Sequence, residues 1–339
     1  MSLLYEKTAG ILEERIKNGA YEVSSRLPGE DKLAAELDIS RGTLHKAIQL
    51  LETKGVLQCR PSVGNFVLKL PRTKRLYAYV TPGLSDPFHA ELIRLFNMKI
   101  VDEGGSLLID DSSHTSADEI ISRLKEESVD GVVFCPRNVD KSALLKDSGI
   151  PALWLAAVPK CQTLDYIMVN DEQGMNAILN HLRDTGIKSA GYAKGVVGSL
   201  VSTRKAAFIK HAELQGLTIN DKWIFEVKQD GEAGGRELFR HFISLESRPE
   251  AIVCYNDWNA IGFIEAALSY GMDIPGDLRV IGFDNLPLSE YYKVPLTTVD
   301  CHLSDFASQA HTMLSKRIED ISTDRHIHIS DCSLVVRKS

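Results

Sequence analysis

The chain has 339 residues, 44% hydrophobic and 25% charged, which is the composition of an ordinary folded protein with room for two or three domains. No run of 18 apolar residues occurs and the first seven residues already carry charge, so we expect no transmembrane helix, no signal peptide and a cytoplasmic location. The six cysteines never form a CxxC pair, which predicts reduced thiols and no metal or cofactor site built on them.

The net charge of −7 is unevenly distributed along the chain. Residues 1–75 hold 13 Lys and Arg against 9 Asp and Glu, a balance of +4, and the remainder of the chain carries −11. A basic segment attracts a polyanion, whereas an acidic one repels phosphate. Any contact with nucleic acid is therefore expected within the first 75 residues.

The first predicted element is a helix over residues 3–18, where Leu4, Ile11, Leu12 and Ile16 fall on one face. Its expected role is to pack beneath the elements that follow. The Asn18-Gly19 pair ends it.

Residues 27–55 contain two short amphipathic helices joined by a turn. Apolar residues at 33, 34 and 37 form one face of the first helix, and those at 44, 47, 48 and 51 repeat at helical spacing in the second. Asp38-Ile39-Ser40 forms the turn, with Ser40 as N-cap, and Gly55 ends the second helix. This pattern predicts a helix-turn-helix, whose second helix begins with side chains suited to base edges in the major groove.

Two short runs, 56–59 and 65–68, follow these helices and predict a β-hairpin wing, because Pro61 and Gly64 lie in the connection. Two helices joined by a turn are also an ordinary structural corner. The wing favours DNA binding over that interpretation.

The motifs LPGEDKLA, ISRGTLHKAIQLL, GVL and GNFV resemble GntR-type transcription regulators, from Leu27 through Val67. The resemblance implies DNA contacts from Arg41 and Thr43 and an approach of the wing glycine to the minor groove. The chain departs from the family pattern at Asp31 and His45, where arginine is usual, and at Gly29, where serine usually caps the helix. The candidate DNA-binding residues are Arg26, Ser40, Arg41, Thr43, His45, Lys46 and Gly64.

Residues 70–75 are predicted to link two parts of the chain, which gives a DNA-binding domain over 1–69 and a second domain over 76–339. Pro71 interrupts the strand pattern and three of the next four residues are basic. A solvated tether and a segment close to the DNA backbone are equally consistent with this composition.

From Leu76 onward, short apolar runs alternate with amphipathic helices, as in a parallel sheet covered on both faces. Predicted strands are Leu76–Val80, Leu107–Asp110, Gly131–Cys135, Ala152–Leu155, Ser189–Tyr192, Trp223–Val227, Ala251–Tyr255 and Arg279–Phe283. Eight such units exceed one sheet of typical size, so we expect an α/β fold of two similar Rossmann-like lobes with a ligand cleft between them.

Polar side chains follow several of these strands, at the edge where ligands of parallel sheets bind. Asp86 follows the first strand, Asn256-Asp257 follows another and Asp284-Asn285 a third, and Arg204 offers a planar fork of donors. Paired hydroxyls suit such groups, so a sugar is the expected ligand. Helix capping, turn formation and a surface ion pair are the alternative roles of these residues taken singly.

The motifs SDPFHAEL, VDGVVF, VNDEQG, STRKAAF, the run from Glu250 to Asn285, PLTTVD and LVVRKS resemble LacI/GalR-type effector domains, which have a periplasmic-binding-protein fold. The resemblance covers nearly all of 76–339. It implies effector contacts from Arg204, Asn256 and Asp284, with Asp86 and Phe88 on the other side of the cleft. Asp257 completes the candidate effector-binding set.

Two departures from that family concern the effector. Ala156 stands where a strand-end aspartate is common, and Gly231 stands where an aromatic residue often stacks on the effector. Trp154, Trp223 or Trp258 is a possible replacement for that aromatic ring, although a core or surface position is the usual one for a single tryptophan.

A GntR-type head joined to a LacI/GalR-type domain resembles the arabinose-repressor kind of bacterial regulator. The expectation is a transcriptional repressor that binds a palindromic operator as a homodimer, responds to a sugar effector and uses no cofactor and no metal. The alternative is an enzyme with a regulatory DNA-binding head, with strand-end Asp and Asn as catalytic groups. The absence of GxGxxG, P-loop, GxSxG and HExxH motifs argues against it.

Overall fold

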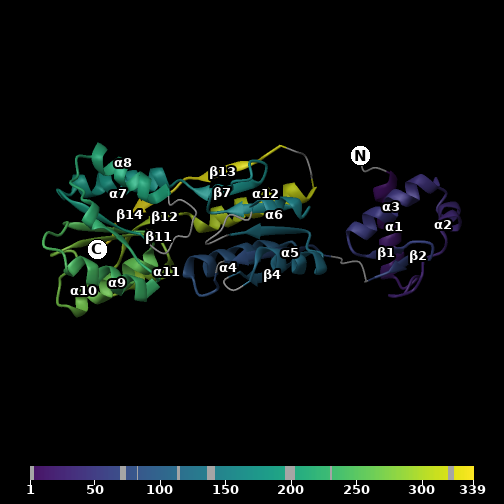
Figure 1. Ribbon diagram of the computed structural model, residues 1–339, viewed down its shortest axis with the longest axis horizontal. Coiled ribbons are helices and arrows are strands. Elements are labelled where there is room, and N and C mark those ends of the chain that lie inside the picture. The colour runs from purple at the N-terminus through teal and green to yellow at the C-terminus, as the bar shows by residue number, and fades with distance from the viewer. Residues whose placement is uncertain are drawn as a thin grey trace. The chain divides into compact units, whose positions relative to one another are not determined.

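The computed structural model describes residues 4–68, 74–81, 83–112, 115–135, 142–194, 203–229, 231–319 and 324–339. The chain divides into two compact units, with the boundary between Arg75 and Leu76 (Figure 1). Of the linker predicted over 70–75, only Lys74 and Arg75 lie within the described residues. Within those same ranges, no helix is long and apolar enough to cross a membrane.

The N-terminal unit is a winged helix-turn-helix. Its elements are α1 (Leu4–Lys17), α2 (Glu30–Glu36), α3 (Arg41–Thr53), β1 (Leu57–Arg60) and β2 (Gly64–Val67). The two strands pair antiparallel, with Arg60 opposite Gly64 at the turn. Ser40 caps α3 by accepting a hydrogen bond from the Thr43 amide at 3.1 Å, and Gly55, at a φ of +64°, follows its last turn.

The apolar residues predicted for this unit form its core. Leu12 and Ile16 of α1, Leu33 of α2 and Leu44 and Leu51 of α3 are fully buried together. The two helices of the helix-turn-helix are thereby fixed against α1, as its predicted role requires. Gly29 caps α2 without a side-chain hydrogen bond, at a cost of only a few tenths of a kcal/mol relative to serine.

The first lobe of the C-terminal unit is a six-stranded parallel sheet. In the order β13-β7-β6-β5-β3-β4, its strands are β13 (Ile327–Ser330), β7 (Asp165–Val169), β6 (Ala152–Leu155), β5 (Gly131–Phe134), β3 (Leu76–Thr81) and β4 (Ser106–Asp111). Its helices are α4 (Pro87–Asp102), α5 (Ala117–Glu126), α6 (Ser142–Asp147) and α12 (Leu303–Glu319). His328 lies on β13, an edge strand of this sheet.

The second lobe repeats this plan with one antiparallel edge. Its order is β14-β12-β11-β10-β8-β9, with β14 (Ser333–Val335), β12 (Thr297–Asp300), β11 (Arg279–Asp284), β10 (Ala251–Cys254), β8 (Ala190–Lys194) and β9 (Ile224–Glu226), and only β14 runs antiparallel to its neighbour. Its helices are α7 (Asp171–Asp184), α8 (Thr203–Leu214), α9 (Gly231–Ile243), α10 (Asp257–Ser269) and α11 (Pro287–Tyr291), with a 3-10 turn at Asp221–Trp223.

Helices α9 and α10 lie side by side (Figure 1) because glycines face each other where they pack. A Cβ at Gly235 would lie 2.4 Å from the Asn259 carbonyl oxygen, and one at Gly262 would lie 2.5 Å from the Glu232 Cα. The backbones therefore approach more closely than side chains would allow. This packing fixes α10, whose first residues belong to the candidate effector site.

The chain crosses between the lobes three times, after β7, after β12 and between β13 and β14. Hydrogen bonds tie these crossings together. The Asn170 amide donates to the Ser330 carbonyl at 2.9 Å, and the Cys332 amide donates to Gln173 Oε1 at 3.2 Å. These bonds join the first and third crossings, and a hydrogen bond of 3.2 Å between the Ser333 hydroxyl and His302 Nε2 joins the second crossing to the third. The three crossings are therefore connected.

All eight predicted strands are present, and their ends differ by one or two residues. Trp223 belongs to the 3-10 turn instead of β9, since Asn220 caps that turn through the Lys222 amide. Four further strands lie outside that list, β7, β12, β13 and β14, and each of them contains polar residues. Four of the six cysteines are buried and all six are free thiols.

Candidate functional site

The start of α3 presents the candidate DNA-binding side chains. The side chains of Arg41 and His45 are 68% and 57% exposed, and Lys46 is exposed as well. The Ser40 and Thr43 hydroxyls lie 2.8 Å apart and share a hydrogen bond. Ser40 and Thr43 therefore fix the first turn of the helix. The side chains that extend from this turn toward solvent are those of Arg41, His45 and Lys46.

Arg26 and Gly64, predicted separately, lie together at the wing. Gly64 has a φ of +130°, and a Cβ there would be 2.5 Å from the Arg26 Nε. The backbone conformation therefore favours glycine at position 64, and the Arg26 side chain passes close over it. Arg60 lies over the Phe66 ring at 4.5 Å, which adds a second cation to the hairpin.

Two acidic residues on the same surface were not predicted as functional. Glu30 Oε1 accepts from Asn65 Nδ2 at 3.2 Å, and its other oxygen lies 3.7 Å from His45 Nδ1 and 3.9 Å from Arg41 Nε. Asp31 lies 3.2 Å from Arg41 Nη1. The sequence signal for them was the acidic pair at the start of α2.

Arg204 of α8 is the centre of the candidate effector site. Its side chain is buried, and its Nε donates to Asp171 Oδ1 at 2.9 Å. Nη1 donates to the Tyr255 carbonyl at 2.7 Å and to Asp284 Oδ1 at 3.4 Å. The guanidinium also lies 3.8 Å from the centre of the Phe283 ring. Burial by itself would lower the pKa of Arg204, but Asp171 and Asp284 outweigh it and raise that pKa well above its usual value.

Asp284, Asn256 and Asp86 each follow a strand or its connection, as predicted. Asp284 ends β11 at a φ of +117°, a backbone conformation that costs energy for a residue other than glycine and is found most often at functional sites. Asn256 caps α10 through the Asn259 amide at 2.9 Å, and Asp86 caps α4 through the Phe88 amide at 3.0 Å.

Electrostatics place these groups around one site. Burial raises the pKa of Asp284 well above its usual value, Arg204 lowers it, and the carboxylates of Asp257, Asp86 and Asp171 raise it further. Asp86 belongs to the first lobe and Asp284 to the second. The charge of Asp86 in one lobe therefore contributes to the raised pKa of Asp284 in the other.

Asp257 has a different place from the one expected, and its assignment to the effector needs correction. The residue is fully buried, one carboxylate oxygen accepts from the Leu286 amide at 2.8 Å, and the other accepts from the Thr298 hydroxyl. A Cβ at Gly282 would lie 2.1 Å from Asp257 Oδ1. Asp257 therefore binds the loop that follows β11 through the Leu286 amide, and it does not face the cleft.

The burial of Asp257 predicts a pH-dependent stability. Burial raises the pKa of its carboxyl from 3.8 to about 7, although the Thr298 hydroxyl and the Leu286 amide act in the opposite direction. Between about pH 4 and pH 7 the folded protein binds a proton that the unfolded chain has lost, so the free energy of unfolding should fall as pH rises, by about 4 kcal/mol in all. Urea unfolding across this range should show the slope in the native protein and a flatter one in Asp257→Asn. Parallel slopes in the two proteins would contradict this assignment.

The departures at Ala156 and Gly231 have distinct surroundings. Ala156 is exposed at the end of β6, with a φ of +64°. Gly231 lies against Trp258, since a Cβ at 231 would be 2.4 Å from the indole ring. Trp258 thus occupies the space that a side chain at 231 would need.

The other two tryptophans have structural positions. Trp154 is fully buried and stacks on Phe134 at 5.4 Å, and Trp223 donates from Nε1 to the Ser247 carbonyl at 2.8 Å. Trp258 alone of the three is partly exposed. It lines a groove of about 390 Å³ between α4 and the α10–α11 region, together with Pro87, Ala90, Glu91, Arg94, Ile261, Leu286, Pro287 and Leu288.

Sequence reasoning missed Asp171 and Tyr255 as partners of Arg204. Asp171 begins α7, two residues after the end of β7, and lies inside the VNDEQG motif. Its position after a strand is the same signal that marked Asp284 as a candidate. Tyr255 contributes its backbone carbonyl, and no sequence pattern marks such a contact. Within the described residues, no group of three or more His, Cys, Asp or Glu is placed to hold a metal ion.

Comparisons with known proteins match both units. The family model described as bacterial regulatory proteins, gntR family, matches residues 4–67, and the model for a periplasmic binding protein-like domain matches residues 179–339. The HTH-type transcriptional repressor PurR of Mannheimia succiniciproducens is 30% identical over 297 residues, which cover 86% of this chain and 88% of that protein. PurR of Photobacterium profundum is 28% identical over 289 residues, 84% of this chain and 86% of its own.

Solved structures show the same fold. A LacI-type transcription regulator from Bifidobacterium animalis subsp. lactis superposes with a TM-score of 0.71 at 23% identity, over 78% of this chain and 98% of that one. A LacI family regulator from Lactobacillus casei with bound glucose gives a TM-score of 0.68 at 20% identity, over 78% and 100%. The matched proteins are regulators, so the enzyme alternative is set aside. This chain belongs to the LacI family of transcriptional regulators, in which it is a DNA-binding regulator with a ligand-binding domain and a GntR-type winged helix-turn-helix as its head.

Proposed function

We propose that this regulator represses carbohydrate-utilisation genes in the cytoplasm and that a sugar or sugar-like effector in the interlobe cleft controls it. The observation that supports the proposal is the arrangement around Arg204, whose guanidinium is held by Asp171, Asp284 and the Tyr255 carbonyl. The guanidinium donates to neighbouring hydroxyls, and the carboxylates beside it accept from them. The glucose bound to the Lactobacillus casei regulator is consistent with this ligand class.

Effector contacts are proposed from both lobes. Arg204, Asn256 and Asp284 act from the second lobe, and Asp86 and Phe88 act from the first. A ligand that bridges them binds the closed arrangement better than the open one and shifts the population toward it. The three connected crossings described above are the hinge about which that shift takes place.

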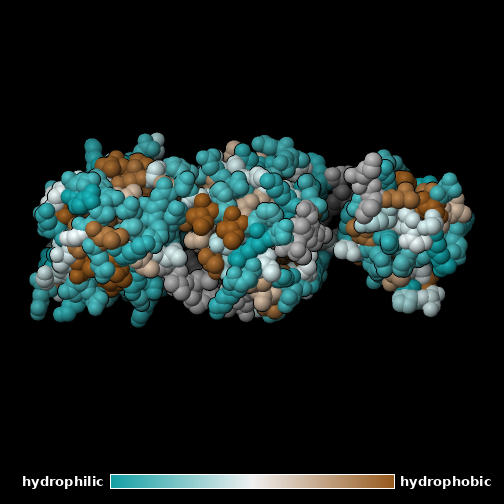
Figure 2. Space-filling model, turned by 90° about the horizontal axis from the view of Figure 1, so that it is seen from above, coloured by the Kyte–Doolittle hydropathy of each residue, from teal (hydrophilic) through white to brown (hydrophobic). Residues whose placement is uncertain are grey.

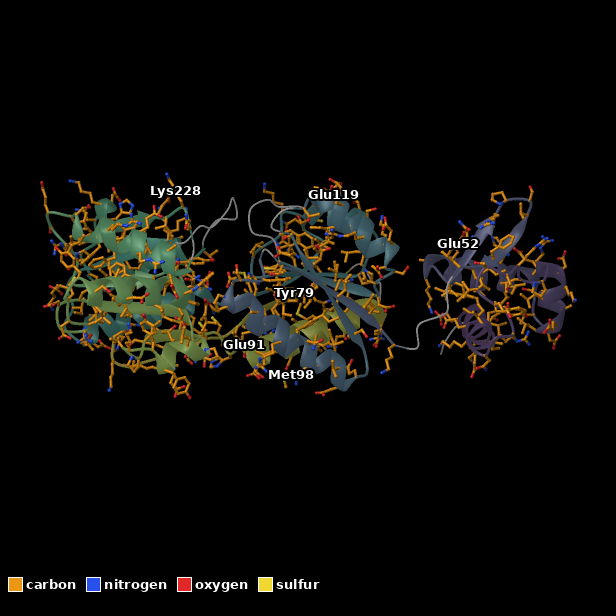
Figure 3. The ribbon with its side chains drawn as sticks, turned by 90° about the horizontal axis from the view of Figure 1, so that it is seen from below. Glu52, Tyr79, Glu91, Met98, Glu119 and Lys228 are labelled. Carbon is orange, nitrogen blue, oxygen red and sulfur yellow. The ribbon has the colours of Figure 1, made fainter. Side chains whose placement is uncertain are left out.

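We further propose a homodimer on a palindromic operator, with a DNA-binding domain over 1–69, a linker over 70–75 and an effector domain over 76–339. Exposed apolar residues on α4 and α11 support the dimer, since Met98, Val101 and Leu288 are each more than half exposed. Figure 3 shows Met98 and Glu91 along α4, and Figure 2 shows separate hydrophobic patches in a mainly hydrophilic surface.

The two DNA-binding domains of such a dimer would bind operator half-sites about one helical turn apart, ~34 Å or a multiple of it. Sedimentation at micromolar concentration should give the mass of two chains.

Thermal unfolding of the full-length protein against a panel of pentoses, hexoses, uronic acids, sugar phosphates and disaccharides tests the effector class. A ligand that binds only the folded state at 100 times its Kd adds about 2.7 kcal/mol, a clear shift in melting temperature. We expect a shift with one neutral sugar or a close relative, followed by a change in operator affinity with the same compound. A shift with none of them would remove the sugar assignment and leave the DNA-binding assignment standing.

A further inference from the structure

The carboxylate of Asp31 is paired with the arginine that starts the DNA-facing helix. Asp31 lies 3.2 Å from Arg41 Nη1, and the two side chains are 81% and 68% exposed. Exposed pairs of this kind contribute little to stability. The pair is therefore free to act on a ligand, and its loss should leave the fold intact.

A second carboxylate, that of Glu30, lies near Arg41. Glu30, only 23% exposed, lies 3.9 Å from Arg41 Nε and 3.7 Å from His45 Nδ1, and it accepts from Asn65 of the wing. The first turn below Arg41 is fixed by the Ser40–Thr43 hydrogen bonds. Arg41 therefore lies close to two carboxylates, of which Asp31 is the nearer.

The chemistry of base edges limits what such a pair can read. In the major groove, guanine presents two acceptors and thymine one acceptor and a methyl group, whereas cytosine and adenine each present an amino donor. Arginine donates to guanine O6 and N7, and a carboxylate accepts only from an amino group. Asp31 would meet repulsion from guanine or thymine at the position it faces.

We propose that Asp31 and Arg41 form a single two-residue base reader, in which Arg41 reads guanine and Asp31 accepts a hydrogen bond from the amino group of an adjoining cytosine or adenine. The proposal rests on Arg41 belonging to the DNA-binding surface. It makes Asp31 a specificity-determining residue of the operator contact, at a position where a carboxylate otherwise only repels phosphate.

Selection of binding sites from a random-sequence DNA pool by the full-length protein tests this without a known operator. Native protein should select a motif with guanine beside an amino-bearing base in each half-site. Asp31→Ala should lose the preference at that one adjoining position by about tenfold and keep the rest of the motif, since a single mismatch typically costs ten- to a hundredfold. Asp31→Asn should no longer disfavour guanine and thymine at that position, because its amide donates as well as accepts. Glu36→Gln is the matched control, because it removes the same charge from the same helix where the partner is Arg15 at 2.6 Å, and its motif should equal the native one.

Arg41→Ala separates this proposal from the assignment beneath it. If Arg41→Ala loses guanine while both Asp31 variants select native bases at every position, the two-residue reader is wrong and Arg41 reads alone. If Arg41→Ala also retains the native motif, the DNA-binding surface assigned to α3 is wrong. A melting temperature equal to that of native protein should accompany each Asp31 variant, which shows that any change of motif comes from recognition.

Discussion

Arg204→Ala should lower the free energy of unfolding by about 3–5 kcal/mol, because it leaves the buried carboxylate of Asp284 and the partly buried carboxylate of Asp171 without their cation. Asp284 is 3% exposed and Asp171 is bonded to the same guanidinium, so neither regains full hydration in the folded variant. The same change should abolish the effector response. Urea unfolding measures the stability, and a ligand-dependent melting shift measures the binding.

Two variants make this result specific. Arg183→Ala removes an exposed arginine that is paired with Asp184 at the surface, and it should cost less than about 1 kcal/mol. Arg204→Lys keeps a positive charge and loses the planar fork, so it should recover part of the stability and little of the effector binding. If Arg204→Ala and Arg183→Ala are equally stable, Arg204 does not stabilise the fold by neutralising Asp171 and Asp284.

Asp284→Ala should abolish the effector response while leaving operator affinity nearly intact. A hydrogen bond between a ligand and a charged group is worth about 1.5–3 kcal/mol, so its loss should weaken effector binding about ten- to a hundredfold. Operator affinity should persist because Asp284 belongs to the C-terminal unit, and the candidate DNA-binding side chains belong to the N-terminal one. Effector titrations followed by melting shift and by release from operator DNA measure both quantities.

The matched control is Asp221→Ala, which removes an exposed carboxylate from the same lobe. Its effector affinity and operator affinity should both match the native protein. If Asp284→Ala retains native effector sensitivity, Asp284 does not belong to the effector site.

Asp284 and Asp257 show how far sequence reasoning reached at the cleft. Both are acidic residues at or just after the end of a strand, and the sequence analysis placed both in the effector-binding site. The structure places Asp284 beside Arg204 and buries Asp257 against Thr298 and the Leu286 amide. Nothing in the local sequence separates the two, because each is followed by the same kind of turn or helix start.

Local structure could be predicted from the sequence alone. The Ser40 and Asn256 caps, the wing turn at Gly64 and most strands of both lobes depend on residues only a few positions apart, so their patterns are visible in the chain. Which polar groups contact each other depends on the tertiary fold. Arg204 contacts Asp171 and Asp284, 33 and 80 positions away, and Glu30 contacts Asn65, 35 positions away. Such partners depend on which helices and strands pack together. The same packing buries the carboxylates, and burial is what shifts their pKa values.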